Sequence, residues 1–366
     1  MFRVLLAVLA IFSTLDALAA NEFKVLVFAR ENRDAMEMAY FKPFRQATGG
    51  ALQDATYDGA EDKFTKMTMS GKANWDVMQV ESRMLDLGCK EGWFEKLDQG
   101  KIGDKADFVP GSISECGIGI FAWSQVFAYN ADNVVGTPSS WADFWDVKKF
   151  PGKRGLRRSA KYTLEFALLA DGVAPADVYK VLATKQGVDR AFRKLDQIKA
   201  DTVWWQAAPQ PSLLLTADKV VMSSAYALWV DDEQHKRGKN LKIVWNGSLH
   251  DFDSWAIPKG APRIADAYKF IAFASKPENQ KAFAMELAYG PTNRKTLPLL
   301  EPKLANTLPT AEANLKGTVA IDIAFWVRNG AALEHRFANW APPLEPTADE
   351  QEEEHHGKKG KPAPGH

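Results

Sequence analysis

The sequence predicts an α/β protein built as two lobes with a ligand cleft between them. At 366 residues, the chain is longer than one hydrophobic core usually supports, so we expect two domains. Short apolar runs alternate with stretches of helical periodicity, which is typical of mixed, mostly parallel sheets flanked by helices. Ligands bind such sheets at the carboxyl ends of the strands. We therefore expect two sheets, one in each lobe, whose strand ends face a shared cleft.

The composition is that of a globular protein, with 46% hydrophobic and 25% charged residues. The 46 basic residues are balanced by 46 acidic ones, so the formal net charge is zero. Proteins that bind nucleic acid usually carry a basic excess that neutralises phosphates. We therefore expect no nucleic acid partner.

The first 19 residues have the pattern of a secretory signal peptide. One basic residue, Arg3, precedes the apolar run 4–12, and the segment ends on Ala17, Leu18 and Ala19, a small-x-small cleavage pattern. The apolar run is too short to span a bilayer as a helix. We therefore predict export to the periplasm. The acidic, Pro/Gly-rich end of the chain, residues 345–366, is predicted to be disordered.

Two cysteines, Cys89 and Cys116, remain in the exported chain. A disulfide is the default in an oxidising compartment. The alternative is a pair of buried free thiols, because the sequence does not give their separation.

The run 116–130 is predicted to be the buried strand around which the chain is organised. It contains no charged residue and is rich in β-branched and aromatic side chains. Gly117, Gly119 and Ala122 match the G-x-G-x-x-A dinucleotide pattern, but no acidic residue stands about 20 positions later. We therefore expect this run to cross from one lobe to the other and do not predict a nucleotide site.

The segment before this strand is predicted to form most of the first lobe. We expect strands at 23–28 and 75–80, and helices at 35–47, 60–70 and 83–89. Since the loops after the two strands lie at their carboxyl ends, residues 29–34 and 81–83 are expected to face the cleft.

The segment after it repeats the alternation. Helices are predicted at 140–144, 163–171, 187–199, 212–217, 263–275 and 277–288. Strands are predicted at 203–205, 220–222, 241–244 and 252–257. A basic loop, 148–158, is expected between the first two helices.

Several runs together resemble one known family. They are CGIGIFAWSQVFAYN, PSSWADFWDVKKFPGKRGLRRSAKYTLEFALLADGV, FDSWAIPKGAP, KFIAFASKPENQKAF and AYGPTN. In this order they resemble the periplasmic solute-binding proteins of ABC importers, in the spermidine/putrescine-binding branch. The resemblance implies a two-lobed type II periplasmic-binding fold, in which the chain crosses between lobes near Tyr129, near Trp255 and after Pro298.

This gives a predicted domain organisation. It comprises a signal peptide at 1–19, a first lobe at 20–128, a second lobe at 129–254, a return to the first lobe at 255–300, C-terminal helices mainly of the second lobe at 301–344, and the tail at 345–366.

The resemblance also implies binding residues. Asp253, in DFDSWAIP, stands where the family places an acid that holds an ammonium group, and Glu31 stands at the acid of its first cleft loop. Tyr226 replaces a family aromatic wall. Ser159 and Tyr162 fall where polyamine binders keep acids, and Asp251 falls where they keep an aromatic. The remaining candidates are Asn32, Glu81, Ser82 and Asn293.

Each of these residues also has a structural explanation. Asp253 is alternatively a solvated strand-end or capping residue, and Glu31 a cap of the following helix. Tyr162 and Tyr226 are alternatively core aromatics with a hydrogen-bonded hydroxyl.

The first ligand class that the resemblance implies is a polyamine-like cation, held by carboxylates and aromatic faces. The alternative is an amino acid or another small carboxylate-bearing metabolite, with Arg30, Arg33 and Arg294 available as a clamp. A secreted enzyme is less expected, since the sequence has no Gly-x-Ser-x-Gly elbow, no metal-ligand spacing and no Cys-x-x-Cys. We predict no catalytic residue, cofactor or metal, and a monomer that delivers a small-molecule solute to an inner-membrane ABC permease.

Overall fold

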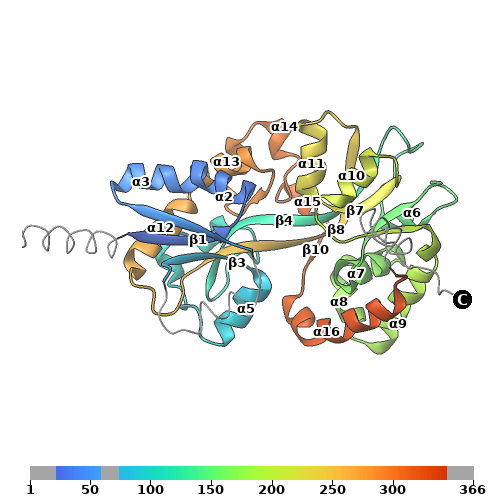
Figure 1. Cartoon of the computed structure of the whole chain (residues 1–366), viewed down its shortest axis with the longest axis horizontal. Helices are drawn as coiled ribbons and strands as arrows, with labels where there is room; N and C mark the ends of the chain where they lie inside the picture. The colour runs from blue at the N-terminus through green and yellow to red at the C-terminus, as the bar shows by residue number, and fades with distance from the viewer. Residues whose placement is uncertain (1–21, 59–73, 344–366) are drawn as a thin grey trace, which may run out of the picture.

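The computed structural model describes residues 22–58 and 74–343. The predicted signal peptide, the predicted helix at 60–70 and the predicted tail lie outside these ranges. The described chain forms two α/β lobes side by side, joined across the middle by two long strands, β4 and β8 (Figure 1). Within the described ranges, no helix is both long and apolar enough to cross a membrane.

The strands of the described chain are hydrogen-bonded into one mixed sheet of order β2-β1-β3-β8-β4-β7-β5-β6, with β9 on β4 and β10 on β8. The strands are β1 (Phe23–Phe28), β2 (Leu52–Tyr57), β3 (Val77–Glu81), β4 (Gly117–Asn130), β5 (Arg154–Arg157), β6 (Thr202–Trp205), β7 (Met222–Tyr226), β8 (Leu241–Ala256), β9 (Gly290–Pro291) and β10 (Val319–Ala320). The outer strands of each half run parallel, whereas β4 pairs antiparallel with β7 and β8.

The sheet is continuous because both lobes share β4 and β8. The first half of β4 pairs with the end of β8 beside β3, and its second half pairs with β7 and the start of β8. The register shifts between the two halves: Gln125 lies opposite Leu249, whereas Phe127 lies opposite Val244. Such irregularities bend a strand. Since β4 and β8 belong to both halves, the predicted lobe boundaries stay a prediction.

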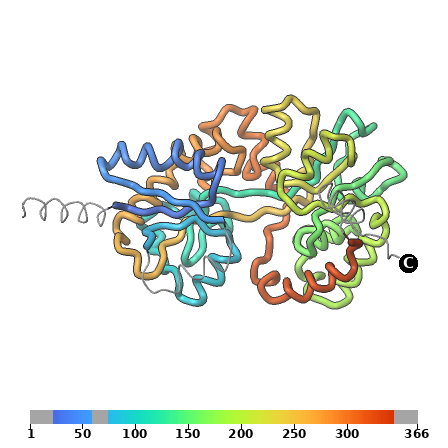
Figure 2. The backbone as a smooth tube through the Cα atoms, in the orientation of Figure 1, coloured from blue at the N-terminus to red at the C-terminus, as the bar shows by residue number. Residues whose placement is uncertain are grey.

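The helices cover the faces of the two halves, as the tube in Figure 2 also shows. They are α2 (Glu31–Met36), α3 (Lys42–Thr48), α5 (Ser82–Lys90), α6 (Trp141–Trp145), α7 (Ala160–Ala170), α8 (Val178–Leu182), α9 (Lys185–Asp196), α10 (Gln210–Thr216), α11 (Ala227–His235), α12 (Ile264–Ala274), α13 (Pro277–Glu286), α14 (Pro302–Ala305), α15 (Glu312–Leu315) and α16 (Ile323–Trp340). A π-helical segment, Glu37–Phe41, joins α2 to α3.

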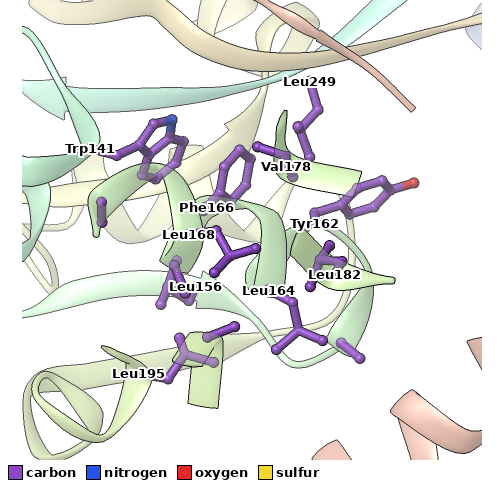
Figure 3. Close-up of a cluster of buried hydrophobic side chains, with 14 of the residues drawn as sticks. Trp141, Leu156, Tyr162, Leu164, Phe166, Leu168, Val178, Leu182, Leu195 and Leu249 are labelled. Carbon is purple, nitrogen blue, oxygen red and sulfur yellow. The ribbon is translucent and has the colours of Figure 1, made fainter. Parts of the chain in front are cut away.

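Each half has its own apolar core. In the first, Phe41, Trp255, Phe270 and Phe283 are almost fully buried. In the second, the ring of Trp141 stacks on Phe166 with 3.8 Å between centroids, in the cluster drawn in Figure 3. Two separate cores allow the halves to move relative to each other with little loss of apolar burial.

Most predicted elements are present, with instructive differences. The strand β1 has the predicted bounds, and Ser140 caps α6 by accepting a hydrogen bond from the Asp143 amide. The strand β2 was not predicted, and β5 lies inside the predicted basic loop. The predicted strands 241–244 and 252–257 are parts of one strand, β8, whose polar middle concealed its continuity.

The disulfide between Cys89 and Cys116 is present, with 5.8 Å between the Cα atoms. It joins the end of α5 to the residue before β4. The predicted bridge is therefore confirmed, and the alternative of two free thiols is wrong.

Candidate ligand-binding cleft

A cavity of about 250 Å³ lies between the two halves, where β4 and β8 cross. It is smaller than the usual ligand pocket of about 300 to 1,000 Å³. Its polar and aromatic lining residues are Phe28, Glu81, Arg83, Phe121, Trp123, Ser124, Lys161, Tyr162, Tyr226, Trp229, Asp251, Asp253 and Tyr289.

The secondary structure explains why these residues meet. Phe28 and Glu81 are the last residues of β1 and β3, and Tyr226 is the last residue of β7. Asp251 and Asp253 are two positions apart on β8, so their side chains point to the same face of the sheet. The cavity therefore lies at strand ends, as expected for an α/β fold.

Asp253 is buried, and a fixed amide orients its carboxylate. The Gln79 side chain donates its Nε2–H to Oδ2 of Asp253 at 2.7 Å. The Gln79 Oε1 accepts hydrogen bonds from the Phe28 amide and from Asn32 Nδ2, so the amide has only one orientation that satisfies both ends. Burial and the nearby Glu81 carboxylate raise the pKa of Asp253 well above its ordinary value, and the Gln79 hydrogen bond opposes this.

Asp251 is held in the same manner by different donors. Its Oδ1 accepts hydrogen bonds from the Ser82 hydroxyl at 2.5 Å and from the Phe252 amide at 2.8 Å. Burial raises the pKa of Asp251 to about 6, against these hydrogen bonds. The cleft therefore contains two buried carboxyl groups whose ionisation is disfavoured by burial.

Basic groups of the second half oppose these carboxylates. Lys161 lines the cavity, and burial lowers its pKa while Asp251 and Glu81 raise it. Behind it, Arg157 donates to the Tyr226 hydroxyl at 3.2 Å and lies over the ring of Tyr162 at 5.1 Å. The cavity thus has acids on β3 and β8, Arg83 from α5, and a half-buried lysine at the start of α7.

Aromatic side chains form the remaining walls. Trp123 meets Tyr162 edge-on with 6.2 Å between centroids and lies 5.7 Å from Tyr226. Phe121 stacks on Tyr289 at 4.2 Å. Trp123, Tyr289 and Lys161 were not among the predicted site residues, although Trp123 lies in the middle of the predicted crossing strand and Lys161 lies beside Tyr162. The available signals were the place of Trp123 in the crossing strand and of Lys161 next to Tyr162.

Two non-glycine residues near the cleft have left-handed backbone angles. Tyr162 has φ 77° and ψ −45°, and Arg30 has φ 65°. Such conformations cost about 1 to 3 kcal/mol each and tend to occur at functional sites. Regular helical geometry in α7 begins only after Tyr162, which agrees with the predicted helix start at Thr163.

The structure places the predicted residues in three groups. Five line the cavity: Asp253, Asp251, Glu81, Tyr226 and Tyr162. Ser82 and Asn32 hold other site residues, through Asp251 and Gln79 respectively. Glu31 is exposed at the start of α2.

Ser159 and Asn293 do not line the cavity. Ser159 donates its hydroxyl to Glu334. Asn293 donates to the Ser275 carbonyl and accepts from the Lys295 amide inside the first half. Both side chains are engaged in local structure, which polar residue type alone does not distinguish from ligand binding.

The arginine clamp considered from the sequence is not formed at the cavity. Arg33 makes a two-point ion pair with Asp54, with Nε–Oδ2 at 2.7 Å and Nη2–Oδ1 at 3.0 Å. Arg294 donates to the Ala106 carbonyl at the surface. Neither lines the cavity. Across residues 22–58 and 74–343, no cluster of three or more His, Cys, Asp or Glu side chains has metal-binding geometry.

Two α/β halves joined by crossing strands, with a polar and aromatic cavity between them, define a solute receptor of the two-lobed periplasmic-binding class. Comparison with protein families agrees: residues 39–310 match the model described as bacterial extracellular solute-binding protein. The chain belongs to this family. Its members are solute-binding receptors rather than enzymes.

Individual relatives are consistent with this assignment. The chain is 51% identical over 322 residues to a gamma-aminobutyric acid-binding protein of Pseudomonas aeruginosa, covering 88% of this chain and 91% of that protein. It is 23% identical over 295 residues to the spermidine/putrescine-binding periplasmic protein of Salmonella typhimurium, covering 76% and 82% of the two chains.

Solved structures give the same fold. An ABC transporter substrate-binding protein from Bradyrhizobium japonicum superposes with a TM-score of 0.78 at 32% identity, covering 88% of this chain and all of that one. The structure of a GABA receptor superposes with a TM-score of 0.77 at 29% identity, covering 90% of this chain and all of that one. The protein is thus an ABC transporter substrate-binding protein, and its role implies a membrane permease as partner.

Proposed function

We propose that this protein is a periplasmic receptor for an ω-amino acid of the size of gamma-aminobutyric acid (GABA), which it delivers to an ABC permease. The observation that carries the proposal is the pairing of charges in one small cavity: carboxylates from β3 and β8, and a half-buried lysine from the start of α7. A zwitterion with an ammonium at one end and a carboxylate at the other complements both.

The acidic side suits the ammonium. Asp251 and Asp253 are desolvated and share the neighbourhood of Glu81, which raises the pKa of each carboxyl. An ammonium placed there supplies the missing counter-charge and forms charge-assisted hydrogen bonds. The rings of Trp123 and Tyr226 supply faces against which the methylene chain packs.

The basic side suits the carboxylate. Lys161 is the cation that lines the cavity in the second half, and Arg157 lies behind Tyr162 and Tyr226. A guanidinium held over the Tyr162 ring and hydrogen-bonded to the Tyr226 hydroxyl is oriented in advance, so less entropy is lost when a carboxylate contacts it directly or through that hydroxyl.

These features favour an amino acid over a polyamine, which was the first ligand class expected from the sequence. A diamine would place its second ammonium near Lys161, and like charges in a buried site repel each other. The relatives at 51% and 29% identity, a GABA-binding protein and a GABA receptor, support the same preference.

Binding is proposed to close the cleft. The ligand contacts both lobes at once only when the lobes approach each other. An ω-amino acid therefore shifts the population towards the closed form. Small-angle scattering tests this step, since GABA should reduce the radius of gyration. Equal scattering with and without bound GABA would refute the closure.

Isothermal titration calorimetry with four ligands tests the specificity. GABA carries both charges, butyrate and butylamine each carry one, and putrescine carries two positive charges. We expect GABA to bind at least about tenfold more tightly than each of the others, because each missing charged contact is worth roughly 1.5 to 3 kcal/mol. Putrescine binding as tightly as GABA would overturn the proposal in favour of the polyamine alternative.

A further inference from the structure

The C-terminal helix α16 contacts the turn that delivers Lys161 to the cleft. One carboxylate on this helix, Glu334, accepts three hydrogen bonds from this turn. The Ser159 hydroxyl donates to Oε1 at 2.6 Å, the Ala160 amide to Oε2 at 3.0 Å, and the Lys161 amide to Oε1 at 3.1 Å.

The backbone of this turn and of the residue that follows it is irregular. Lys161 has φ −63° and ψ 132°, and Tyr162 follows with φ 77°, so α7 is interrupted directly after its first residue. A strained turn persists only when its surroundings over-determine its conformation. Ser159, the N-cap residue, uses its hydroxyl on Glu334 and makes no side-chain cap to its own helix. Glu334 therefore supplies the acceptors that a capping residue normally provides.

The charge of Glu334 suits this position. A carboxylate forms charge-assisted hydrogen bonds with amide and hydroxyl donors, which are stronger than those of a neutral acceptor. Burial lowers the pKa of Arg157, whereas Tyr226, Tyr162 and, as the smallest contribution, Glu334 raise it, so that the pKa is raised overall. One side chain outside the cavity thus fixes the backbone of Lys161 and favours the charge of Arg157.

Two other hydrogen bonds connect α16 and the residues after it to the same region, but neither involves an atom of residues 159–161. Trp326 donates its Nε1–H to Glu165 in α7 at 2.8 Å, and Arg158 donates to the Pro342 carbonyl after α16. These bonds position the helix as a whole. The Glu334 carboxylate is the group of α16 that accepts from the amides of Ala160 and Lys161.

We propose that Glu334 is a positioning residue for the carboxylate-binding half of the cleft: it holds the turn 159–161 so that Lys161 and Tyr162 face the ligand. The part of this inference that concerns ligand affinity rests on the proposed function. The part that concerns the turn is independent of any ligand.

The turn is tested first, in ligand-free protein, by amide hydrogen exchange of the wild type and the Glu334→Gln variant. The substitution keeps the size of the side chain but replaces one acceptor oxygen by an NH₂ group facing N–H donors. We expect exchange of the Ala160 and Lys161 amides to become at least about tenfold faster, with little change in α9 or α12. Unchanged exchange at both amides would overturn the proposal whatever the ligand is.

Affinity for GABA is tested second by calorimetry. Glu334→Gln should weaken binding by about 10- to 100-fold, and Ser159→Ala, which removes one of the three bonds, should weaken it less. The matched control is Glu286→Gln, an exposed helical glutamate in α13 that forms no ion pair within the described chain. It removes the same charge and should leave the Kd within about twofold.

A double-mutant cycle separates positioning from general destabilisation. In a Lys161→Met background, Glu334→Gln should cost less than about threefold, because the group that it positions is already gone. A full, additive loss in that background would refute the positioning role. If the wild type does not bind GABA, the proposed function fails while the exchange result still decides the inference; if the wild type binds and Glu334→Gln binds equally well, only the inference fails.

Discussion

Replacing Asp251 by asparagine should make the ligand-free protein more stable and the receptor weaker. Burial raises the pKa of this carboxyl from an ordinary 3.8 to about 6. The stability that the protonated form contributes is present below about pH 4 and is lost as the pH rises to about 6, because the folded protein must then carry a desolvated charge. At about 1.4 kcal/mol per pKa unit, the penalty at pH 7.5 is roughly 3 kcal/mol.

Asparagine avoids this penalty at little structural cost. Its side-chain oxygen accepts the hydrogen bonds that the Ser82 hydroxyl and the Phe252 amide now donate to Oδ1. We therefore expect the Asp251→Asn variant to unfold at higher urea concentration at pH 7.5, by up to roughly 3 kcal/mol, and the two proteins to converge near pH 4. Thermal melts at both pH values check the same difference.

The same substitution should weaken GABA binding at pH 7.5 by roughly 10- to 150-fold, the value of one hydrogen bond to a charged group. Opposite signs for stability and affinity identify a carboxylate retained for function. Equal stability of the two proteins at both pH values would contradict the electrostatic explanation. A destabilised variant with normal affinity would show that Asp251 serves the fold instead.

Three further outcomes follow from the same geometry. Affinity for GABA should fall as the pH drops below about 6, by up to tenfold per unit, because Asp251 becomes protonated; a flat profile between pH 5 and 7 in calorimetry would contradict this. Cys89→Ser with Cys116→Ser should lower the free energy of unfolding by roughly 3 to 4 kcal/mol, from the loop that the disulfide closes, and urea titration measures it against the oxidised wild type. Arg33→Gln should leave the Kd for GABA within about twofold and cost under about 1 kcal/mol, because its partly exposed guanidinium pairs with Asp54 away from the cavity; a large loss of affinity would restore the arginine clamp.

The acidic residues of the cleft were predicted in two ways: Asp251 and Asp253 from the resemblance to the family, and Glu81 from its place at the end of a strand. Asp251 and Asp253 are alternate residues of one strand, so the face that they share is fixed once the strand is identified. Glu81 follows from the rule that strand ends face the cleft.

The basic half of the cleft could not be predicted from the sequence, because its residues are positioned by contacts between distant segments of the chain. Lys161 reaches the cavity through a non-helical turn held by Glu334, which lies 173 positions away in the chain. Arg33 looked available because its partner Asp54 lies in β2, a strand that was not predicted. Contacts between distant segments decide which cations are already paired, and a single sequence carries no pattern for them.

Under the proposed function, the charges of the cleft favour an open cleft when no ligand is bound. Without ligand, Asp251 and Asp253 lie near Glu81 in a site where desolvation raises the pKa of both aspartates, and closing the lobes would remove more water from them. The same holds for Lys161, whose pKa is lowered by burial. A zwitterion offsets both penalties at once, whereas a cation or an anion alone offsets only one. Closure is therefore expected to require a ligand with both charges, so that the permease encounters the closed form mainly when the correct solute is bound.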